Sequence, residues 1–539
     1  MIRPHLLVPL LLVSCGQPAE DETVDGYTLL SPRRQLIRLS VDLRGVHPSE
    51  AELQAIEADP ALYDDFVDRF LDDPRFLDRI EEVWNQRLLT GTGSTYGYAH
   101  PQASGAEVAS AIGGESLQLV RRIVDQDLPW TEIVLADYTV ATPLLASLFG
   151  LERQPGEGWQ PAVYSDGREH AGILTMSSTW LRYPSMGGNA NRHRANAVSK
   201  MLLCDDYLSR PIVLNRAAVD QLTVDPETAI STNVACQSCH STLDPLSAHF
   251  FGFFYPEDDD GDAVTYRPEN EKAWMEYADQ PPGYYGVPTA SIRELGERIA
   301  EDSRFVDCAV RTAYEGLTQH ALHPDDWTSF QAHRSAFTGE GLRIKPLVRS
   351  IVSSPAYRAS SADDPAVAER LAGVKMVSPR QLQTIVEGVT GYKWTFAGTD
   401  ALTDNSRGLP VLLGGIDGST VTTPSWEPSV GAVFVQERLA WSAAWDVAAH
   451  DLAAGRTAEA RMLRFVTREH TPEADAALFD AQIRDLYLQV TGLPLAETAA
   501  EPAQLATLWR QIHSVEGTPE AAWAGVLTAI LRDPLVLTY

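Results

Sequence analysis

Three segments of the chain repeat one helix pattern, and this pattern constrains the fold more than any other feature. In each segment a serine or threonine precedes a proline, apolar residues recur at helical spacing, and a glycine follows. A side-chain hydroxyl caps a helix N-terminus, proline fits the first turn, and glycine ends the last turn. The segments run from Ser31-Pro32 to Gly45, from Ser378-Pro379 to Gly391 and from Thr471-Pro472 to Gly492. We therefore expect a mainly α-helical fold.

A second element recurs beside these helices. An apolar helical run ends near a proline and is followed by an aromatic or aliphatic anchor, around Asp73-Pro74, Ser354-Pro355 and Asp533-Pro534. A duplicated module explains both patterns, but amphipathic helices that begin with proline are also common in unrelated chains. Both explanations stay open. Because no repeat period is fixed, a solenoid is not expected.

Length and composition predict a multidomain chain. The 539 residues, of which 44% are hydrophobic and 22% charged, are enough to bury two or three cores. A loop-like stretch after residue 150 and a linker over residues 359–366 predict segments at 27–150, 151–358 and 367–539. Residues 410–425 interrupt the helical pattern with glycine, threonine and serine, and we expect a long loop or a short hairpin there.

The N-terminus has the features of an export signal. Arg3 precedes an apolar run, Leu6 to Val13, that is too short to span a bilayer and is followed by Ser14-Cys15. We predict a lipoprotein signal peptide with a lipobox over residues 1–15, an acylated Cys15, and a polar tether over residues 16–26. The protein would then be exported and lipid-anchored at the periplasmic or outer-membrane face of the envelope. The alternative is a chance cysteine after a short apolar start.

The overall charge limits the partners. The formal net charge is −30 and the sequence pI is about 4.8. Such a body repels phosphate backbones and anionic lipid surfaces, so nucleic acid is not an expected partner. A cationic redox partner protein is compatible with it. No stretch after the signal region is long and apolar enough to predict a transmembrane helix.

One short motif carries the chemistry. Cys236-Gln237-Ser238-Cys239-His240 is the attachment signature of c-type haem. Two thiols one helical turn apart add across the two haem vinyl groups, and the adjacent histidine becomes the proximal iron ligand. We predict one covalent haem c, held by Cys236 and Cys239, with iron bound by His240. Attachment of this kind occurs outside the cytoplasm, which agrees with export.

Two other uses of the motif are less consistent with the sequence. A structural zinc site needs two further ligands, and no second closely spaced cysteine or histidine pair lies near the motif. A thioredoxin-like thiol pair is expected at a helix start that follows a strand, within an α/β pattern absent from this sequence. Downstream, the acidic turn Asp258–Asp262 has carboxylates that suit Ca²⁺, but its glycine is misplaced for an EF-hand loop and a surface turn is preferred.

The residues after the motif suggest a haem crevice. Pro245 or a neighbouring carbonyl is expected to accept the Nδ1 proton of the proximal imidazole. Apolar and aromatic side chains follow closely and are expected to pack on the porphyrin faces, with an ordinary core patch as the alternative; they are Leu243, Leu246, Phe250, Phe251, Phe253 and Phe254.

Several segments together carry a family resemblance. They are Gln35 to Gly45 with the helix to Pro74, Trp130 to Glu132, Ala136 to Thr139, Gly172 to Thr175, His193 to Cys204, Cys236 to Leu246, Phe305 to Arg311 and Leu342 to Tyr357. Together they resemble the planctomycete-type cytochrome c-like multidomain proteins, which also occur in myxobacteria. The resemblance covers roughly residues 30–358 and implies a cytochrome c-like haem domain over residues 151–358. Leu243 and Ser247 depart from the family, which usually has methionine and glycine there.

Two further predictions concern the remaining cysteines and the distal ligand of the iron. Cys204 and Cys308 are spare thiols in an oxidising compartment, and we predict a disulfide between them. The distal iron ligand is predicted among Met176, His193 and Met275. A six-coordinate iron would indicate extracytoplasmic electron transfer, our first interpretation. The alternatives are a haem enzyme acting on peroxide or an envelope substrate, and a cell-surface binding protein with a structural haem. No hydrolase triad or nucleotide-binding motif was found.

Overall fold

The computed structural model of the chain describes residues 23–539, except 92–96, 186, 212–215, 217–218, 221–222, 224–225, 255–264, 279, 372, 405–406 and 454–458. Helices contain 61% of the residues and strands 7%, so the expectation of a mainly α-helical, multi-helix fold is confirmed. None of the described helices is both long enough and apolar enough to cross a membrane.

The helices of the first part of the chain are α1 Pro32–Arg44, α2 Glu50–Ala58, α3 Tyr63–Leu71, α4 Pro74–Leu88, α5 Gly105–Asp125, α6 Glu132–Leu135, α7 Pro143–Phe149, α8 Ser177–Arg182, α9 Arg192–Leu203, α11 Pro226–Thr232, α12 Val234–Ser247 and α13 Trp274–Tyr277. Those of the second part are α14 Ile292–Glu301, α15 Ser303–Thr318, α16 Trp327–Gly339, α17 Ile344–Val352, α18 Pro355–Arg358, α19 Pro365–Ala368, α20 Pro379–Thr390, α21 Leu409–Leu412, α22 Val430–Asp451, α23 Ala476–Thr491, α24 Glu501–Glu516 and α25 Pro519–Leu531. Short 3₁₀ turns connect several of them.

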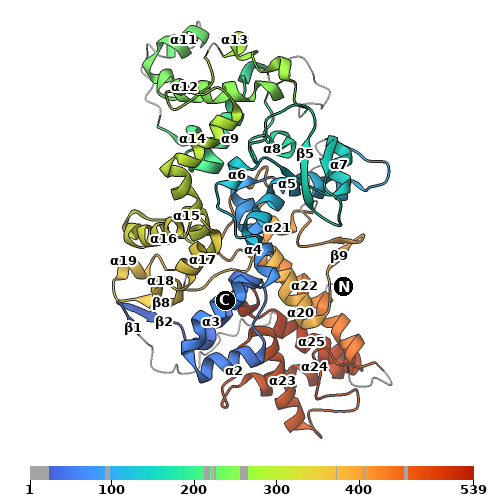
Figure 1. The fold of residues 1–539 in the computed structure, drawn as a ribbon. Coiled ribbons are helices and arrows are strands. Elements are labelled where there is room, and N and C mark those ends of the chain that lie inside the picture. Colours follow the sequence, from blue (N-terminus) through green and yellow to red (C-terminus); the bar gives the residue numbers. More distant parts are fainter. Residues whose placement is uncertain are drawn as a thin grey trace.

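The molecule is elongated (Figure 1). One end is formed by α9, α11, α12 and α13, and the other by α2 and α3 together with the C-terminal helices α23, α24 and α25. The helices α4, α5 and α15 to α17 lie between these ends. The CxxCH motif is part of α12 and therefore lies at the end opposite the C-terminal helices.

Two of the three repeated helix starts are found where the sequence predicts them. Ser31 caps α1, and Gly45 ends it in the left-handed conformation with φ 69°. Ser378 caps α20 in the same way, and Gly391 ends it with φ 67°. The third helix was placed one turn too early: α23 begins at Ala476, because Asp475 accepts a hydrogen bond from the backbone N–H of Thr471 and closes a separate turn.

The second recurrent element has a local explanation. Asp73 caps α4, Ser354 caps α18, and Asp533 caps a 3₁₀ turn at Pro534–Val536, and in each case the following proline occupies the first turn. Each proline therefore begins a new helix after the apolar helix before it ends. Residues 410–425 form neither of the two expected structures in full, because α21 makes one helical turn at Leu409–Leu412 before an irregular segment follows.

The segment 359–366, expected to be a linker, contains strand β8 and the start of α19 at Pro365. Strand β8, Ala359–Ala362, pairs antiparallel with β2, Tyr27–Leu29, which in turn pairs with β1, Thr23–Val24. Residues 359–362 and the end of the expected tether are thus ordered by long-range pairing.

A second sheet of order β3-β5-β4, with β3 Thr139–Ala141, β4 Leu151–Arg153 and β5 Gln160–Tyr164, crosses the boundary expected at residue 150. Two hairpins, β6 Gly283–Tyr284 with β7 Val287–Pro288 and β9 Thr395–Phe396 with β10 Thr399–Asp400, complete the strands.

One core runs through most of the chain. Its buried residues extend from Leu36 to Leu537 in a single connected cluster. Inside it, the ammonium group of Lys375 contacts the carboxylate of Asp42 on α1, and the hydroxyls of Tyr357 and Tyr539 donate hydrogen bonds to the same carboxylate. Asp42 thus joins the N-terminal helix to the last residue of the chain.

Candidate haem attachment site

The local sequence explains why the motif is helical. The Asn233 side chain caps α12 by accepting a hydrogen bond from the backbone N–H of Ala235 at 3.0 Å. Cys236 and Cys239 follow three residues apart, so both lie on the same side of the helix. Both thiols are free of disulfides and partly exposed. The structure therefore presents two neighbouring thiols at the surface, which is the arrangement that attachment to two haem vinyl groups needs.

The imidazole of His240 is held from one side. Its Nδ1 lies 3.0 Å from Oδ1 and 3.2 Å from Oδ2 of Asp244, one turn further along α12. Pro245 and the backbone carbonyls were therefore the wrong prediction for this contact, because the side chain at i+4 on a helix reaches the ring first. The acceptor is a carboxylate, so it changes the electron donation of the ring as well as its orientation.

Asp244 is itself paired. The guanidinium of Arg192, the first residue of α9, donates from Nε at 2.7 Å and from Nη2 at 3.1 Å to the two carboxylate oxygens. Burial alone would raise the pKa of Asp244, but the hydrogen bonds from His240 and Arg192 outweigh it and the pKa lies below its usual value. The carboxylate is therefore ionised at neutral pH and accepts the Nδ1 proton. This leaves the lone pair on Nε2 of His240.

The geometry fits the proposed ligand role of His240. Nε2 has no hydrogen-bond partner among the described residues, whereas Nδ1 is occupied. A metal-bound histidine ordinarily donates its other ring N–H to a carboxylate or a carbonyl, which fixes the tautomer and the ring orientation. Because α9 reaches Asp244, it lies on the Nδ1 side of the ring. A haem iron bound to Nε2 would lie on the opposite side of the imidazole.

Exposed aliphatic side chains flank the motif. Val234, the first residue of α12, is 79% exposed. Leu208, on the 3₁₀ turn Tyr207–Ser209, is 86% exposed, and this turn is tied to α12 by a 2.8 Å hydrogen bond between the hydroxyls of Tyr207 and Thr242. Two single exposed aliphatic side chains are common on protein surfaces and do not by themselves mark a binding site.

The aromatic residues after the motif belong to the core instead of a crevice. Phe250 and Phe253 are buried against Trp180, and Phe251 and Phe254 pack against each other and against Tyr277. Leu243 and Leu246 are buried as well. Protein atoms already cover these side chains, so the alternative interpretation as an ordinary core patch is correct.

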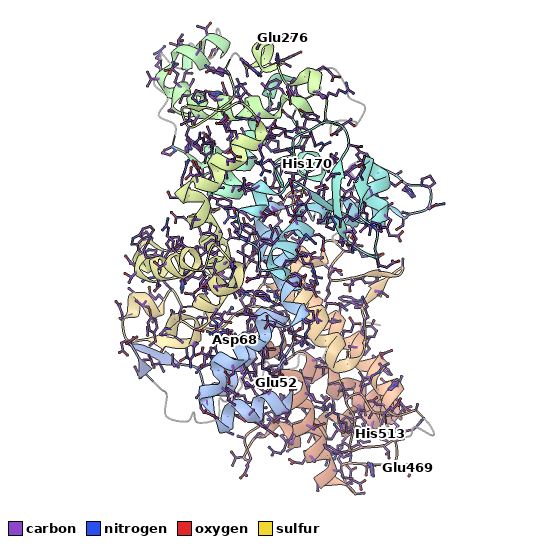
Figure 2. The ribbon with its side chains drawn as sticks, in the orientation of Figure 1. Glu52, Asp68, His170, Glu276, Glu469 and His513 are labelled. Carbon is purple, nitrogen blue, oxygen red and sulfur yellow. A yellow bond between two sulfur atoms is a disulfide. The ribbon has the colours of Figure 1, made fainter. Side chains whose placement is uncertain are left out.

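The three distal candidates have very different surroundings. Met176 is fully buried in the main core before α8, so its sulfur is enclosed by other side chains. His193 lies on α9, next to Arg192, and its Nδ1 donates to the carbonyl oxygen of Pro184 at 2.9 Å. Met275, on α13, is 59% exposed. Glu276, the next residue on α13, projects at the outer edge of the α12 end of the molecule (Figure 2).

The structure joins Cys204 and Cys308 in a disulfide, as the sequence predicted, with 5.2 Å between the Cα atoms. Cys204 ends α9 and Cys308 lies on α15. The bond therefore ties the helix that carries Arg192 to a helix in the middle of the molecule.

Two other predicted residues or segments fall outside the described residues: the acylated Cys15 and the acidic turn Asp258–Asp262. Among the described residues, no group of three or more histidine, cysteine, aspartate or glutamate side chains is placed to hold a metal ion. The zinc alternative therefore finds no further ligands there.

Two features that bear on the candidate functions were not predicted from the sequence. The first is Asp244, although the spacing His240 to Asp244 is the spacing of side chains that meet on a helix. The second is an exposed apolar face of α22, which the cell-surface binding alternative would require; its residues are Val430, Val433, Phe434, Trp441 and Trp445. Helical periodicity marks those residues as one face, but not whether it is covered.

Comparisons with protein-family models, with curated proteins and with solved structures found no match to this chain.

Proposed function

We propose that this protein is an exported c-type cytochrome-like protein with one covalent haem, and that it works in electron transfer. The arrangement on α12 is the observation that supports this most: two free thiols face one side, and His240 keeps Nε2 available while Asp244 holds Nδ1. Haem iron supplies a reversible one-electron centre when bound. Cys236 and Cys239 would hold the porphyrin, and His240 would bind the iron.

Asp244 sets the electronic character of the site in this proposal. A carboxylate behind a ligating imidazole raises the basicity of the ring, which stabilises the more oxidised metal and lowers the reduction potential. Arg192 shares the same carboxylate and offsets part of its negative charge. We infer a haem with a low reduction potential. This potential depends on the contacts from His240 to Asp244 and from Asp244 to Arg192.

We propose Met275 as the distal ligand. It is exposed, it belongs to the short helix α13, and its neighbour Tyr277 packs on Phe254 close to the end of α12. Met176 would have to leave the core, and His193 would have to give up its hydrogen bond to Pro184.

The cellular setting remains the one proposed from the sequence. Export and acylation of Cys15 would hold the protein at the envelope, and the charge of −30 favours a cationic redox partner. A resemblance to the planctomycete-type and myxobacterial cytochrome c-like multidomain proteins agrees with this setting.

A haem enzyme is the second candidate, and Asp244 is also the observation that favours it. Stronger electron donation from the proximal ligand favours activation of peroxide, provided that the distal position is open. The haem enzyme would act on peroxide or on an envelope substrate.

Absorption spectra of the ferric and ferrous protein separate the two candidates. Electron transfer predicts a low-spin, six-coordinate ferric iron that Met275→Ala converts to high spin, with Met176→Leu as the matched control that leaves the spectrum unchanged. A wild-type protein that is already high-spin contradicts electron transfer and supports the enzyme.

A further inference from the structure

A cleft lies near the middle of the molecule, where α4 and α21 are neighbours in Figure 1. It consists of two adjoining cavities of about 360 and 170 Å³. The larger cavity is within the usual range for small-molecule sites, about 300 to 1,000 Å³. The lining of the cleft comes mostly from α4, α15, the start of α20 and the segment 402–426, so the cleft forms where segments distant in the sequence meet.

Gln86 and Trp426 stand at the centre of the cleft, because both line both cavities. Neither side chain makes a hydrogen bond with another described residue, and the indole of Trp426 makes no contact with another described ring. An amide with a free donor and a free acceptor therefore lies near a half-buried aromatic face with an unused N–H. Such a pair offers stacking and two-sided hydrogen bonding to one ligand.

The charged groups of the larger cavity are already paired. Arg79 is paired with Glu82, Glu81 with Arg121 at 3.7 Å, and Arg380 with Asp78 at 3.8 Å. The larger cavity therefore presents no surplus charge of either sign to a ligand, whereas in the smaller cavity Arg87 and Arg311 share the carboxylate of Glu315. A phosphate or a carboxylate ligand would have to break one of these pairs, whereas an uncharged polar ligand would not.

We propose that this cleft binds a neutral oligosaccharide. The pyranose ring of such a ligand has an apolar face that stacks on an indole and a rim of hydroxyls that both donate and accept, which matches Trp426 and Gln86. Ser425 and Thr403 add hydroxyls to the lining. The two connected cavities suit a chain of sugar rings.

An extended peptide is the competing ligand. One common way to bind an extended peptide is to pair its main chain with an exposed strand edge. Among the described residues, none that lines the two cavities belongs to a strand. The cleft therefore offers side-chain contacts without a main-chain template, which favours the sugar.

Calorimetric titration of the purified chain with cellohexaose, xylohexaose, chitohexaose and maltohexaose tests the proposal. We expect a Kd of about 1 mM or tighter for at least one of them. Trp426→Ala and Gln86→Leu should each weaken that affinity about tenfold, because each removes one central contact. Trp426→Phe keeps an aromatic face and should retain most of the binding. Trp445→Ala, on the exposed face of α22, is the matched control and should leave the affinity unchanged.

Circular dichroism and thermal melting of every variant show whether the fold is kept. Absence of binding to all four sugars overturns the proposal. Binding that survives both Trp426→Ala and Gln86→Leu overturns it as well, as does binding of a casein peptide digest in place of the sugars.

Discussion

Two buried aspartates each contact a cation and at least one ring side chain, yet their roles differ. Asp42 lies in the central core with Lys375, Tyr357 and Tyr539, and all of these partners are far away in the sequence. Asp244 lies on α12 with His240 and Arg192, and its histidine partner is one turn away. The side chain of Lys375 is 1% exposed, whereas that of His240 is 23% exposed.

This difference separates a structural contact from one available for chemistry. Lys375 and Tyr357 are enclosed and Tyr539 is half-buried, so the cluster serves to hold the two halves of the chain together. Asp244 is enclosed too, but it orients an imidazole whose other nitrogen faces away from the protein contacts. The first cluster should govern stability, and the second should govern the properties of a bound iron.

The largest expected effect is on the Asp42 cluster. Burial lowers the pKa of Lys375 to about 8, although Asp42 raises it, so the ammonium is charged at pH 7. Lys375→Met leaves the carboxylate without its cation, and removing one partner of a buried ion pair costs about 3–5 kcal/mol. Denaturant unfolding measures this loss in the free energy of unfolding. Lys345→Met, in the exposed pair with Asp72, is the control and should cost at most about 1 kcal/mol.

Equal losses for the two lysine variants would show that the Asp42 cluster is not a structural joint. Chemical unfolding of both variants in parallel makes this comparison within one protein.

Asp244→Asn should mainly change the reduction potential of the haem-loaded protein. The amide keeps a hydrogen-bond acceptor for Nδ1 but removes the negative charge, so the imidazole donates less and the reduction potential of the haem-loaded protein should rise. Arg192 loses its ion pair, and we expect a stability loss of about 2–3 kcal/mol, smaller than that of Lys375→Met. Spectroelectrochemical titration measures the potential. Asp446→Asn, on α22, is the control, and a potential that moves equally in both variants argues against a role for Asp244.

Lowering the pH should reduce the free energy of unfolding by a smaller amount, through a third residue. His333 is buried without a charged partner, and burial lowers its pKa to about 4. Below pH 6.5 the unfolded chain binds a proton that the folded chain does not. The free energy of unfolding therefore decreases as the pH is lowered from 6.5 to 4. This residue accounts for about 2 kcal/mol between pH 7 and pH 5. His333→Gln should flatten that part of the profile of unfolding free energy against pH. An unchanged slope contradicts the assignment.

The sequence predicts local features of this fold well and long-range ones poorly. Ser31, Ser378 and their glycines act within one helix, so their roles follow from neighbouring residues. The segment 359–366 has the composition of a linker, but its pairing with β2 depends on residues more than 300 positions away. No local pattern contains that information.

The candidate site divides in the same way. The spacing of Cys236, Cys239 and His240 is local and predicts one helix face. Asp244 was within reach of the same reasoning, but its pairing with Arg192 depends on how α9 packs on α12. The cleft around Gln86 and Trp426 is built from segments that only the fold brings together.

Covalent haem attachment to Cys236 and Cys239 is the central claim, and retention of haem after denaturation tests it most directly. The full chain is expressed in a host competent in c-type maturation, denatured, and extracted with acid acetone. The account predicts that haem stays with the wild-type polypeptide and is lost from the double variant Cys236→Ala, Cys239→Ala, while Cys204→Ser with Cys308→Ser keeps it. A colourless wild-type protein, or haem that is extracted from it, would contradict the account.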